Sequence, residues 1–120
     1  MYRQMLKAKL HKATITEANL DYEGSLSIDR ELLDAVGIAP FERVKVYNIN
    51  NGERFDTYAI EGEAGSGIIG LNGAAARKGM VGDLIIIVTF GFLPEGELEG
   101  YHPMIALIDE NNKIKKMLTK

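Results

Sequence analysis

The sequence predicts a mainly β protein, and more narrowly a small β-barrel of six or more short strands with two short helices. Three observations predict it. Short segments alternate apolar and polar residues with the period of two that strands have, and the dipeptide Asn51-Gly52 marks a tight hairpin turn. Only one segment in the first half has helix capping signals at both ends. The length of 120 residues and the hydrophobic content of 46% fit a single domain over residues 1–120.

The first expected strand covers residues 6–16, where apolar residues alternate with polar ones. The period of two places Lys9 and His11 on the same face of this strand. A polar turn that contains a glycine follows at residues 19–24, and residues 25–28 form a short extended segment. The turn therefore separates the first two strands.

A helix is expected at residues 30–36, between two signals that mark its ends. Asp29 is a residue type that caps helix N-termini, and Gly37 is the type that ends helices. Two further strands are expected at residues 44–49 and 54–60, joined through the Asn-Gly turn. The first half of the chain should therefore end in a β-hairpin.

The second half is expected to add three strands. A loop of small residues at 62–67 leads to a strand at 68–71, and residues 72–77 form a turn that opens into one helical turn. The apolar run at residues 84–90 predicts a strand buried on both faces, and residues 104–108 predict another strand. The lysine-rich C-terminal end is expected to fray.

Composition argues against several classes of function. The 14 Lys and Arg residues against 17 Asp and Glu give a formal net charge of −3, which argues against a nucleic-acid partner. The lack of cysteine excludes disulfides, thiolate nucleophiles and iron–sulfur clusters, and the two histidines form no His-Glu-x-x-His pair, so no metal is expected. The longest apolar run is too short to span a membrane, so we expect a cytoplasmic protein without a membrane partner.

Familiar catalytic motifs are also missing. The tripeptide Gly65-Ser66-Gly67 lacks the Gly-Lys-Ser/Thr that completes a phosphate-binding loop, and a plain turn explains it better. No serine lies in the Gly-x-Ser-x-Gly elbow of a hydrolase, and no Ser-x-x-Lys indicates pyridoxal phosphate. By itself, Gly24-Ser25 in a polar turn is an ordinary structural feature.

Five segments taken together resemble the pyruvoyl-dependent aspartate decarboxylase family, whose members make β-alanine from L-aspartate. They occur in the family's order, at residues 7–11, 20–29, 51–58, 72–77 and 82–86. The resemblance implies a six-stranded double-psi β-barrel that assembles as a homotetramer with active sites between subunits. It also implies a lyase that decarboxylates L-aspartate to β-alanine and CO₂ for pantothenate biosynthesis, without a metal or pyridoxal phosphate.

The resemblance further implies that the chain cleaves itself between Gly24 and Ser25. Ser25 Oγ would attack the Gly24 carbonyl, and elimination and hydrolysis would follow. The products would be a β chain of residues 1–24 and an α chain of residues 25–120 that begins with a pyruvoyl group. Gly24 suits this position because it has no Cβ to shield its carbonyl and tolerates strained dihedral angles.

The family's site residues carry over to matching positions of this sequence. Thr57 and Asn72 would contact the reacting groups during self-processing. Without the resemblance, Thr57 would be interpreted as an ordinary strand residue and Asn72 as a turn residue. In turnover the pyruvoyl group from Ser25 would form a Schiff base with the substrate amine, and Tyr58 would donate the proton that completes the product. The resemblance also implies a set of substrate-binding residues, Arg54, Thr57, Gly73, Ala74, Ala75 and Lys9. It implies a supporting role for His11 and Tyr22.

Alternatives stay open at this point. The chain could instead be a noncatalytic β-barrel binding module or a stalled, unprocessed precursor, because one fold hosts several functions. Arg54 and Tyr58 are four residues apart, roughly 13 Å along an ideal strand, so a four-carbon substrate bridges them only if Arg54 extends inward or the two come from different subunits. The need for an accessory maturation factor, the preference for aspartate over glutamate and the role of residues 93–120 stay open as well.

Overall fold

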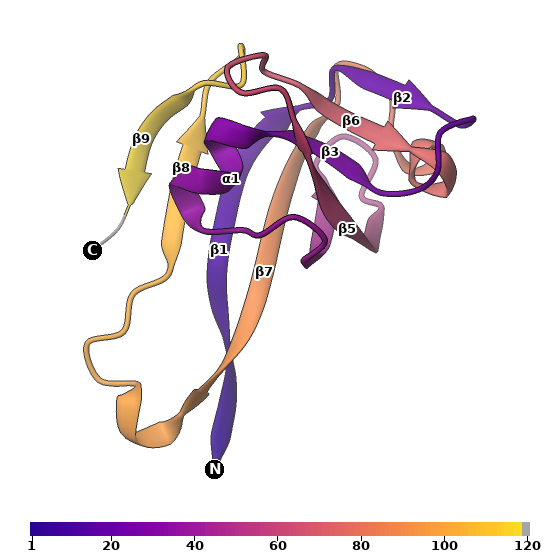
Figure 1. Cartoon of the computed structure of the whole chain (residues 1–120). Coiled ribbons are helices and arrows are strands. Elements are labelled where there is room, and N and C mark those ends of the chain that lie inside the picture. The colour runs from indigo at the N-terminus through magenta and orange to yellow at the C-terminus, as the bar shows by residue number, and fades with distance from the viewer. Residues whose placement is uncertain (119–120) are drawn as a thin grey trace.

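The computed structural model describes residues 1–118 and is mainly β, as the sequence predicts (Figure 1). Within these residues there are nine strands, one α-helix and two short 3₁₀ helices. In chain order the elements are β1 (Tyr2–Thr14), β2 (Glu17–Asn19), β3 (Leu26–Asp29), α1 (Arg30–Val36), β4 (Arg43–Asn48), β5 (Arg54–Gly62), β6 (Ile69–Asn72), η1 (Gly73–Lys78), β7 (Leu84–Pro94), η2 (Glu95–Glu97), β8 (Met104–Ile108) and β9 (Ile114–Leu118).

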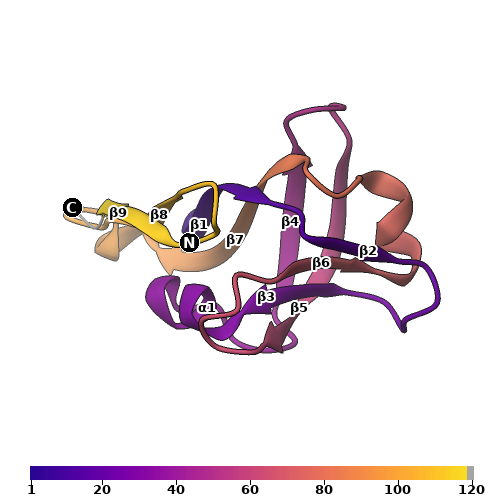
Figure 2. The ribbon, with the colours of Figure 1, turned by 90° about the horizontal axis from the view of Figure 1, so that it is seen from above.

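The strands form one sheet that curls back on itself. Their order is β2-β6-β3-β5-β4-β7-β1-β8-β9, so the six strands from β6 to β1 are consecutive neighbours. The chain leaving β1 then returns to β6, where the Thr16 N–H donates to the Ile69 carbonyl at 2.8 Å and the Ile69 N–H donates to Thr16 Oγ1 at 2.9 Å. Figure 2 shows this passage from β1 into β2 beside β6. No continuous ladder of the described residues closes the sheet, but the curl agrees with a barrel built on six strands.

The core fills the inside of this curled sheet. Alternate residues along the strands point inward, and α1 covers one side with Leu32, Leu33 and Val36. The largest fully buried side chains on the strands include Leu10, Leu26, Ile28, Ile69, Leu71, Ile85 and Ile87. Their burial fixes the register of each strand, because a slip by one residue would expose them.

The β4–β5 hairpin is confirmed and carries one side of the site described below. The two strands are antiparallel, with Tyr47 opposite Arg54. The turn is longer than a two-residue turn, since the Gly52 N–H donates to the Asn48 carbonyl and the Asn48 N–H donates to the Glu53 carbonyl, both at 2.9 Å. Gly52 has a φ of 78°, which explains the glycine at this position.

Three sequence-based expectations for strands were wrong in detail. β1 begins at Tyr2 and β7 continues to Pro94, because these two exposed ends pair with each other and need no apolar alternation to be extended. β7 is not buried on both faces, since Ile86 is half-buried and Phe90 is 36% exposed. The lysine-rich end does not fray over residues 114–118, where β9 pairs with β8. Residues 119–120 of that end lie outside the described residues.

Within residues 1–118, none of the helices has the length and apolar character that a membrane crossing requires. The same residues contain no group of three or more histidine, aspartate or glutamate side chains placed to hold a metal ion.

Asp29 caps α1 as predicted and also holds a distant loop. The Glu31 N–H donates to Asp29 Oδ1 at 2.8 Å, and Gly37, with a φ of 74°, ends the helix. The same carboxylate accepts from the Gly65 N–H at 2.9 Å and from the Gly67 N–H at 2.8 Å. Burial acts to raise the pKa of Asp29, but the three donated N–H groups outweigh it and lower that pKa below its ordinary value.

Asp29→Asn is expected to lower the free energy of unfolding at pH 7 by about 1–3 kcal/mol, because an amide cannot accept from all three N–H groups. Because the pKa of Asp29 is lowered in the folded state, the unfolded chain binds the proton more readily. The stabilisation by the Asp29 carboxylate is therefore full above the ordinary aspartate pKa of about 3.9 and is lost as the pH falls below it. Urea unfolding of both proteins at pH 7 and pH 3 measures the difference. Asp34→Asn, at an exposed position of the same helix, is the control, and an equal loss in both variants at pH 7 would contradict the role of Asp29.

Candidate active site

A pocket of about 410 Å³ lies where β5, η1 and the segment before β3 meet. Its walls include six residues that the sequence singled out. The residues that line it are Gly24, Ser25, Phe55, Asp56, Thr57, Tyr58, Ala74, Ala75 and Lys78. Segments far apart in the chain therefore converge here, as the sequence analysis expected of residues 24–25, 57–58 and 74–75.

Ser25 has the most unusual backbone and side chain in the pocket. Its φ is 97°, a conformation that residues with a Cβ rarely adopt, although Ser25 is not glycine. The residue is only 2% exposed, and its Oγ is buried without a hydrogen-bond partner. A buried hydroxyl is normally paired, and backbone strain is concentrated at functional sites. Ser25 is thus a strained residue with an unused nucleophilic oxygen.

The end of β6 holds the segment that contains Ser25. The Asn72 N–H donates to the Ser25 carbonyl at 2.9 Å, whereas the Asn72 side-chain amide donates to Ser27 Oγ at 2.9 Å. The structure therefore connects Asn72 to Ser25 through its backbone. Gly73, with a φ of 63°, packs so closely that a Cβ on it would lie 2.8 Å from the Gly24 nitrogen. Only glycine fits this contact, which explains the residue at position 73.

Gly73→Ala is expected to displace the segment around Gly24 and to lower the free energy of unfolding by roughly 1–3 kcal/mol, since both the φ and the close contact disfavour a side chain. Gly100→Ala is the matched control, because Gly100 also has a positive φ, 80°, but its Cβ would meet no atom within 4 Å. Urea unfolding, together with the yield of any cleavage after residue 24, compares the two variants. Equal effects of the two substitutions would show that the contact with Gly24 is unimportant.

Thr57 and Tyr58 reach the pocket from β5. Thr57 is half-buried in the pocket wall, while Tyr58 is 41% exposed. The Tyr58 hydroxyl lies beside the segment that precedes Ser25, since a Cβ built on Gly24 would be 3.8 Å from Tyr58 Oη. The Tyr58 ring also faces the Phe41 ring, with 6.4 Å between centroids. The phenol hydroxyl, which can donate a hydrogen bond, is therefore placed next to Gly24.

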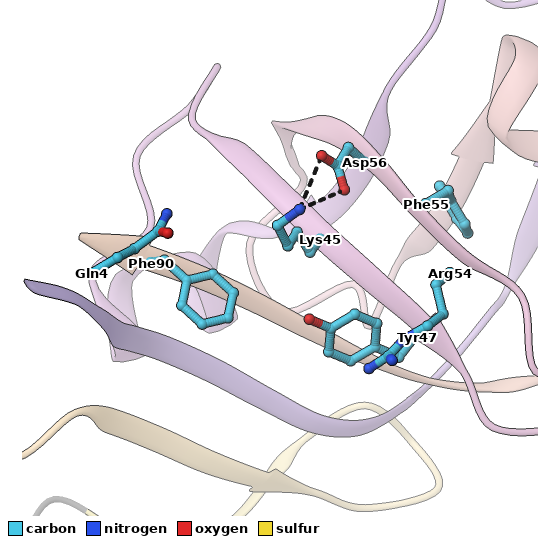
Figure 3. Close-up of a pocket in the computed structure, with 7 residues that line it drawn as sticks. All are labelled: Gln4, Lys45, Tyr47, Arg54, Phe55, Asp56 and Phe90. Carbon is cyan, nitrogen blue, oxygen red and sulfur yellow. Dashed lines mark hydrogen bonds and ion pairs between the residues drawn. The ribbon is translucent and has the colours of Figure 1, made fainter. Parts of the chain in front are cut away.

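Arg54 does not line this pocket but a neighbouring one, shown in Figure 3. The second pocket has a volume of about 380 Å³, and the two share Phe55 and Asp56 as wall residues. The guanidinium carbon of Arg54 lies 4.0 Å from the centroid of the Tyr47 ring, in a cation–π contact. Lys45 Nζ is 3.2 Å from the Asp56 carboxylate in the same pocket. Within one chain, Arg54 and Tyr58 therefore line two different, adjacent pockets.

Lys9, His11 and Tyr22 also lie outside the walls of the Ser25 pocket. Lys9 and His11 are half-buried on β1 and alternate with buried residues, so they share a face as predicted. Burial, together with the nearby charges of Lys9 and Lys12, lowers the pKa of His11, whose Nδ1 is buried without a partner. Tyr22 is 59% exposed in the turn before Gly24. A single copy of the chain does not bring these three side chains into the pocket wall.

Three pocket residues were missed in the sequence analysis. Phe55 and Asp56 lie within the 51–58 segment, and strand periodicity offered no reason to select them from their neighbours. A hydrogen bond from Arg43 and another from Lys45 lower the pKa of Asp56. Lys78 follows the expected helical turn by one residue, and its Nζ lies 3.0 Å from Glu53 Oε1. The sequence signal that could have selected Lys78 is its position, as a basic residue directly after the turn that carries Ala74 and Ala75.

Comparison with known proteins identifies the family of this small, mainly β protein. The profile of the family described as aspartate decarboxylase matches residues 1–115. The aspartate 1-decarboxylase of Desulfotalea psychrophila is 60% identical over 118 residues, which cover 98% of this chain and 99% of that protein. The aspartate 1-decarboxylase of Ralstonia pickettii is 56% identical over 115 residues, 96% of each chain, and that of Phenylobacterium zucineum is 58% identical over 112 residues, 93% of this chain and 95% of that protein. The chain belongs to the aspartate decarboxylase family.

Proposed function

We propose that this protein removes the α-carboxyl group of L-aspartate as CO₂ and releases β-alanine, the precursor needed for pantothenate biosynthesis. Membership of the family and the names of relatives at 54–60% identity support the substrate and the product. The observation that carries the proposal is Ser25, whose buried, unpartnered hydroxyl and positive φ occur at the wall of the pocket.

The chain first has to convert Ser25 into the reactive group. Ser25 Oγ attacks the Gly24 carbonyl carbon, the Gly24–Ser25 C–N bond breaks, and the nitrogen takes up the hydroxyl proton, which leaves an ester. Loss of the Ser25 Cα proton and cleavage of the Cβ–O bond then release Gly24 as a carboxylate. Water replaces the remaining nitrogen, ammonia leaves, and residue 25 becomes a pyruvoyl group. The products are residues 1–24 and residues 25–120.

Several features of the structure favour this self-processing. Gly24 has no Cβ to shield its carbonyl, and the strain at Ser25 is relieved when the bond breaks. An attack on an amide creates an oxyanion that needs donors, and Thr57 in the same pocket wall has a hydroxyl that can donate to it. The Asn72 backbone fixes the Ser25 carbonyl on the other side. The residues present therefore fit a pyruvoyl group at position 25.

A pyruvoyl group supplies a carbonyl that accepts the electron pair left when CO₂ departs. The side chains around it then decide the outcome. Tyr58 donates the proton to the former α-carbon, which requires a neutral acid within reach of position 25. Ala74 and Ala75 carry small side chains, so a substrate in the pocket can approach their backbone groups closely. Gly73 lies outside the pocket wall, packed against Gly24, and is proposed to contact the substrate through its backbone. Arg54 binds a substrate carboxylate through its planar pair of donors.

We propose that the working protein is a homotetramer with its sites between subunits. Arg54, Lys9 and His11 of one chain lie outside the wall of the Ser25 pocket, which is expected if a neighbouring copy supplies them. Tyr2 and Phe92, on the long β1–β7 pair in Figure 1, are 64% and 70% exposed and offer apolar surface for such contacts. An accessory maturation factor would act on the cleavage step and not on turnover.

Dilution below the dissociation range of the tetramer is therefore expected to abolish turnover while the fragments 1–24 and 25–120 remain intact. Analytical ultracentrifugation gives the assembly state, and the rate of β-alanine release per subunit is measured at the same concentrations. Full specific activity of a dilute monomer would rule out sites shared between subunits.

Mass analysis of the purified, denatured protein tests the proposed function together with an assay of β-alanine release from L-aspartate. We expect two fragments separated after residue 24, the larger one bearing a carbonyl in place of the Ser25 amine, and loss of activity after borohydride treatment. A single species of 13.2 kDa without β-alanine release would instead identify a stalled precursor or a noncatalytic barrel module. Incubating the purified protein alone shows whether cleavage needs a partner.

A further inference from the structure

The charged side chains in the wall of the Ser25 pocket differ in whether they can bind a ligand. The two ionisable groups in it, apart from the Tyr58 phenol, are Asp56 and Lys78. Asp56 is already neutralised, because Arg43 and Lys45 both bind its carboxylate. Among residues 1–118, Lys78 is the one cation that lines this pocket, since Arg54 lies in the neighbouring pocket against Tyr47. A dicarboxylate that enters the pocket therefore meets the Lys78 ammonium as the positive charge that this chain supplies, beside any that a neighbouring copy adds.

The β4–β5 turn fixes the backbone of Lys78. Its carbonyl accepts from Asn51 Nδ2 at 3.0 Å and from Asn48 Nδ2 at 3.2 Å. The same Asn48 amide group donates to Asp83 Oδ2 at 3.0 Å, and Asn48 is only 3% exposed. A residue whose main chain is held this firmly at the end of η1 presents its side chain from a fixed position. The same contacts hold η1, which carries Ala74 and Ala75, against the pocket.

The side chain of Lys78 has a partner that a substrate can replace. Lys78 Nζ lies 3.0 Å from Glu53 Oε1, and the two side chains are 43% and 47% exposed. An exposed pair of this kind contributes little to stability, so exchanging one carboxylate for another costs little. The Glu53 N–H donates to Asn51 Oδ1 at 2.8 Å, so Glu53 belongs to the same turn that binds the Lys78 carbonyl.

We propose that Lys78 is a substrate-binding residue that holds one carboxylate of the dicarboxylic substrate, and that Glu53 is its counter-ion when the pocket is empty. The proposal rests on the proposed function, because it assigns a further residue to that same pocket. Glu53 competes with the substrate for the ammonium and so sets the affinity for dicarboxylates. Monocarboxylic amino acids lack the second anionic group that displaces Glu53.

The experiment compares Lys78→Gln, Lys78→Arg and Glu53→Gln in the processed enzyme, with Arg77→Gln as control. Arg77 is the exposed preceding residue of η1 and does not line the pocket. We measure kcat and KM for L-aspartate and the dissociation constant of succinate, an unreactive dicarboxylate, by calorimetry. Lys78→Gln is expected to raise KM and the succinate constant roughly three- to tenfold with kcat little changed, and Glu53→Gln to lower both by a few fold. Lys78→Arg should restore binding, and Arg77→Gln should leave it unchanged.

Three outcomes overturn the proposal. Unchanged succinate binding in Lys78→Gln removes the assigned role, and so does an equal effect of Arg77→Gln, which would indicate a general field of positive charge. A lower kcat or reduced cleavage in Lys78→Gln without a change in binding would make Lys78 a structural residue of η1. If the wild type is cleaved but does not decarboxylate L-aspartate, the proposed function fails, while the succinate titration still decides whether Lys78 binds a dicarboxylate.

Discussion

Ser25→Ala is expected to leave the chain uncut at its full 120 residues and to abolish β-alanine formation completely. The substitution removes only the hydroxyl, because alanine keeps the Cβ and therefore the same backbone strain at a φ of 97°. Without Oγ no ester forms between residues 24 and 25, and no carbonyl group arises at position 25. Denaturing mass analysis and the decarboxylation assay on one preparation measure both losses.

Ser66→Ala is the control for this experiment. Ser66 Oγ donates to the Glu63 carbonyl at 2.6 Å in the loop before β6, away from the pocket wall. This variant should be cleaved and active like the wild type. Cleavage after residue 24 in Ser25→Ala, or β-alanine release by its uncut chain, would disprove the assignment of Ser25. Thermal unfolding of Ser25→Ala shows that the chain remains folded.

Tyr58→Phe is expected to be cleaved normally and to decarboxylate L-aspartate about 10²–10⁴-fold more slowly, because it lacks the acid that protonates the product carbon. The aromatic ring remains, so the contact with Phe41 is retained and the wall of the pocket keeps its shape. The measurement is kcat at pH 7 for fully processed protein, with the fraction of cleaved chain determined on the same sample.

Tyr101→Phe is the matched control, because it also removes one phenolic hydroxyl. Tyr101 Oη donates to the Leu6 carbonyl at 2.7 Å, far along the chain from the pocket residues. Its loss should cost about 0.5–1.5 kcal/mol of stability and leave kcat unchanged. A kcat for Tyr58→Phe within a few fold of the wild type would show that another group supplies the proton.

The features that could be predicted from the sequence are those that depend on neighbouring residues. The helix at Arg30–Val36 begins after Asp29 and ends at Gly37, as predicted, because capping involves groups within one turn of the helix ends. The β4–β5 hairpin was predicted for the same reason, since the glycine of its turn needs a positive φ. The family motifs also singled out Ser25 and Tyr58, and both side chains line one pocket.

The features that the sequence could not predict depend on contacts between distant segments. Asp29 also binds the loop at Gly65, and β1 extends to Tyr2 because the far end of β7 pairs with it. Lys78 enters the pocket because the β4–β5 turn binds its carbonyl, and no local pattern reports that contact.

The sequence by itself therefore determined the mainly β class and the helix with its caps, and it selected Gly24, Ser25 and Tyr58 as candidate residues that the structure brings to one pocket. The tertiary structure alone decided that Ser25 Oγ is buried without a partner and that Arg54 lies in a second pocket against Tyr47. The physical reason is that capping and alternation act over a few residues, whereas burial, strain and the walls of a pocket result from segments that fold together from opposite ends of the chain.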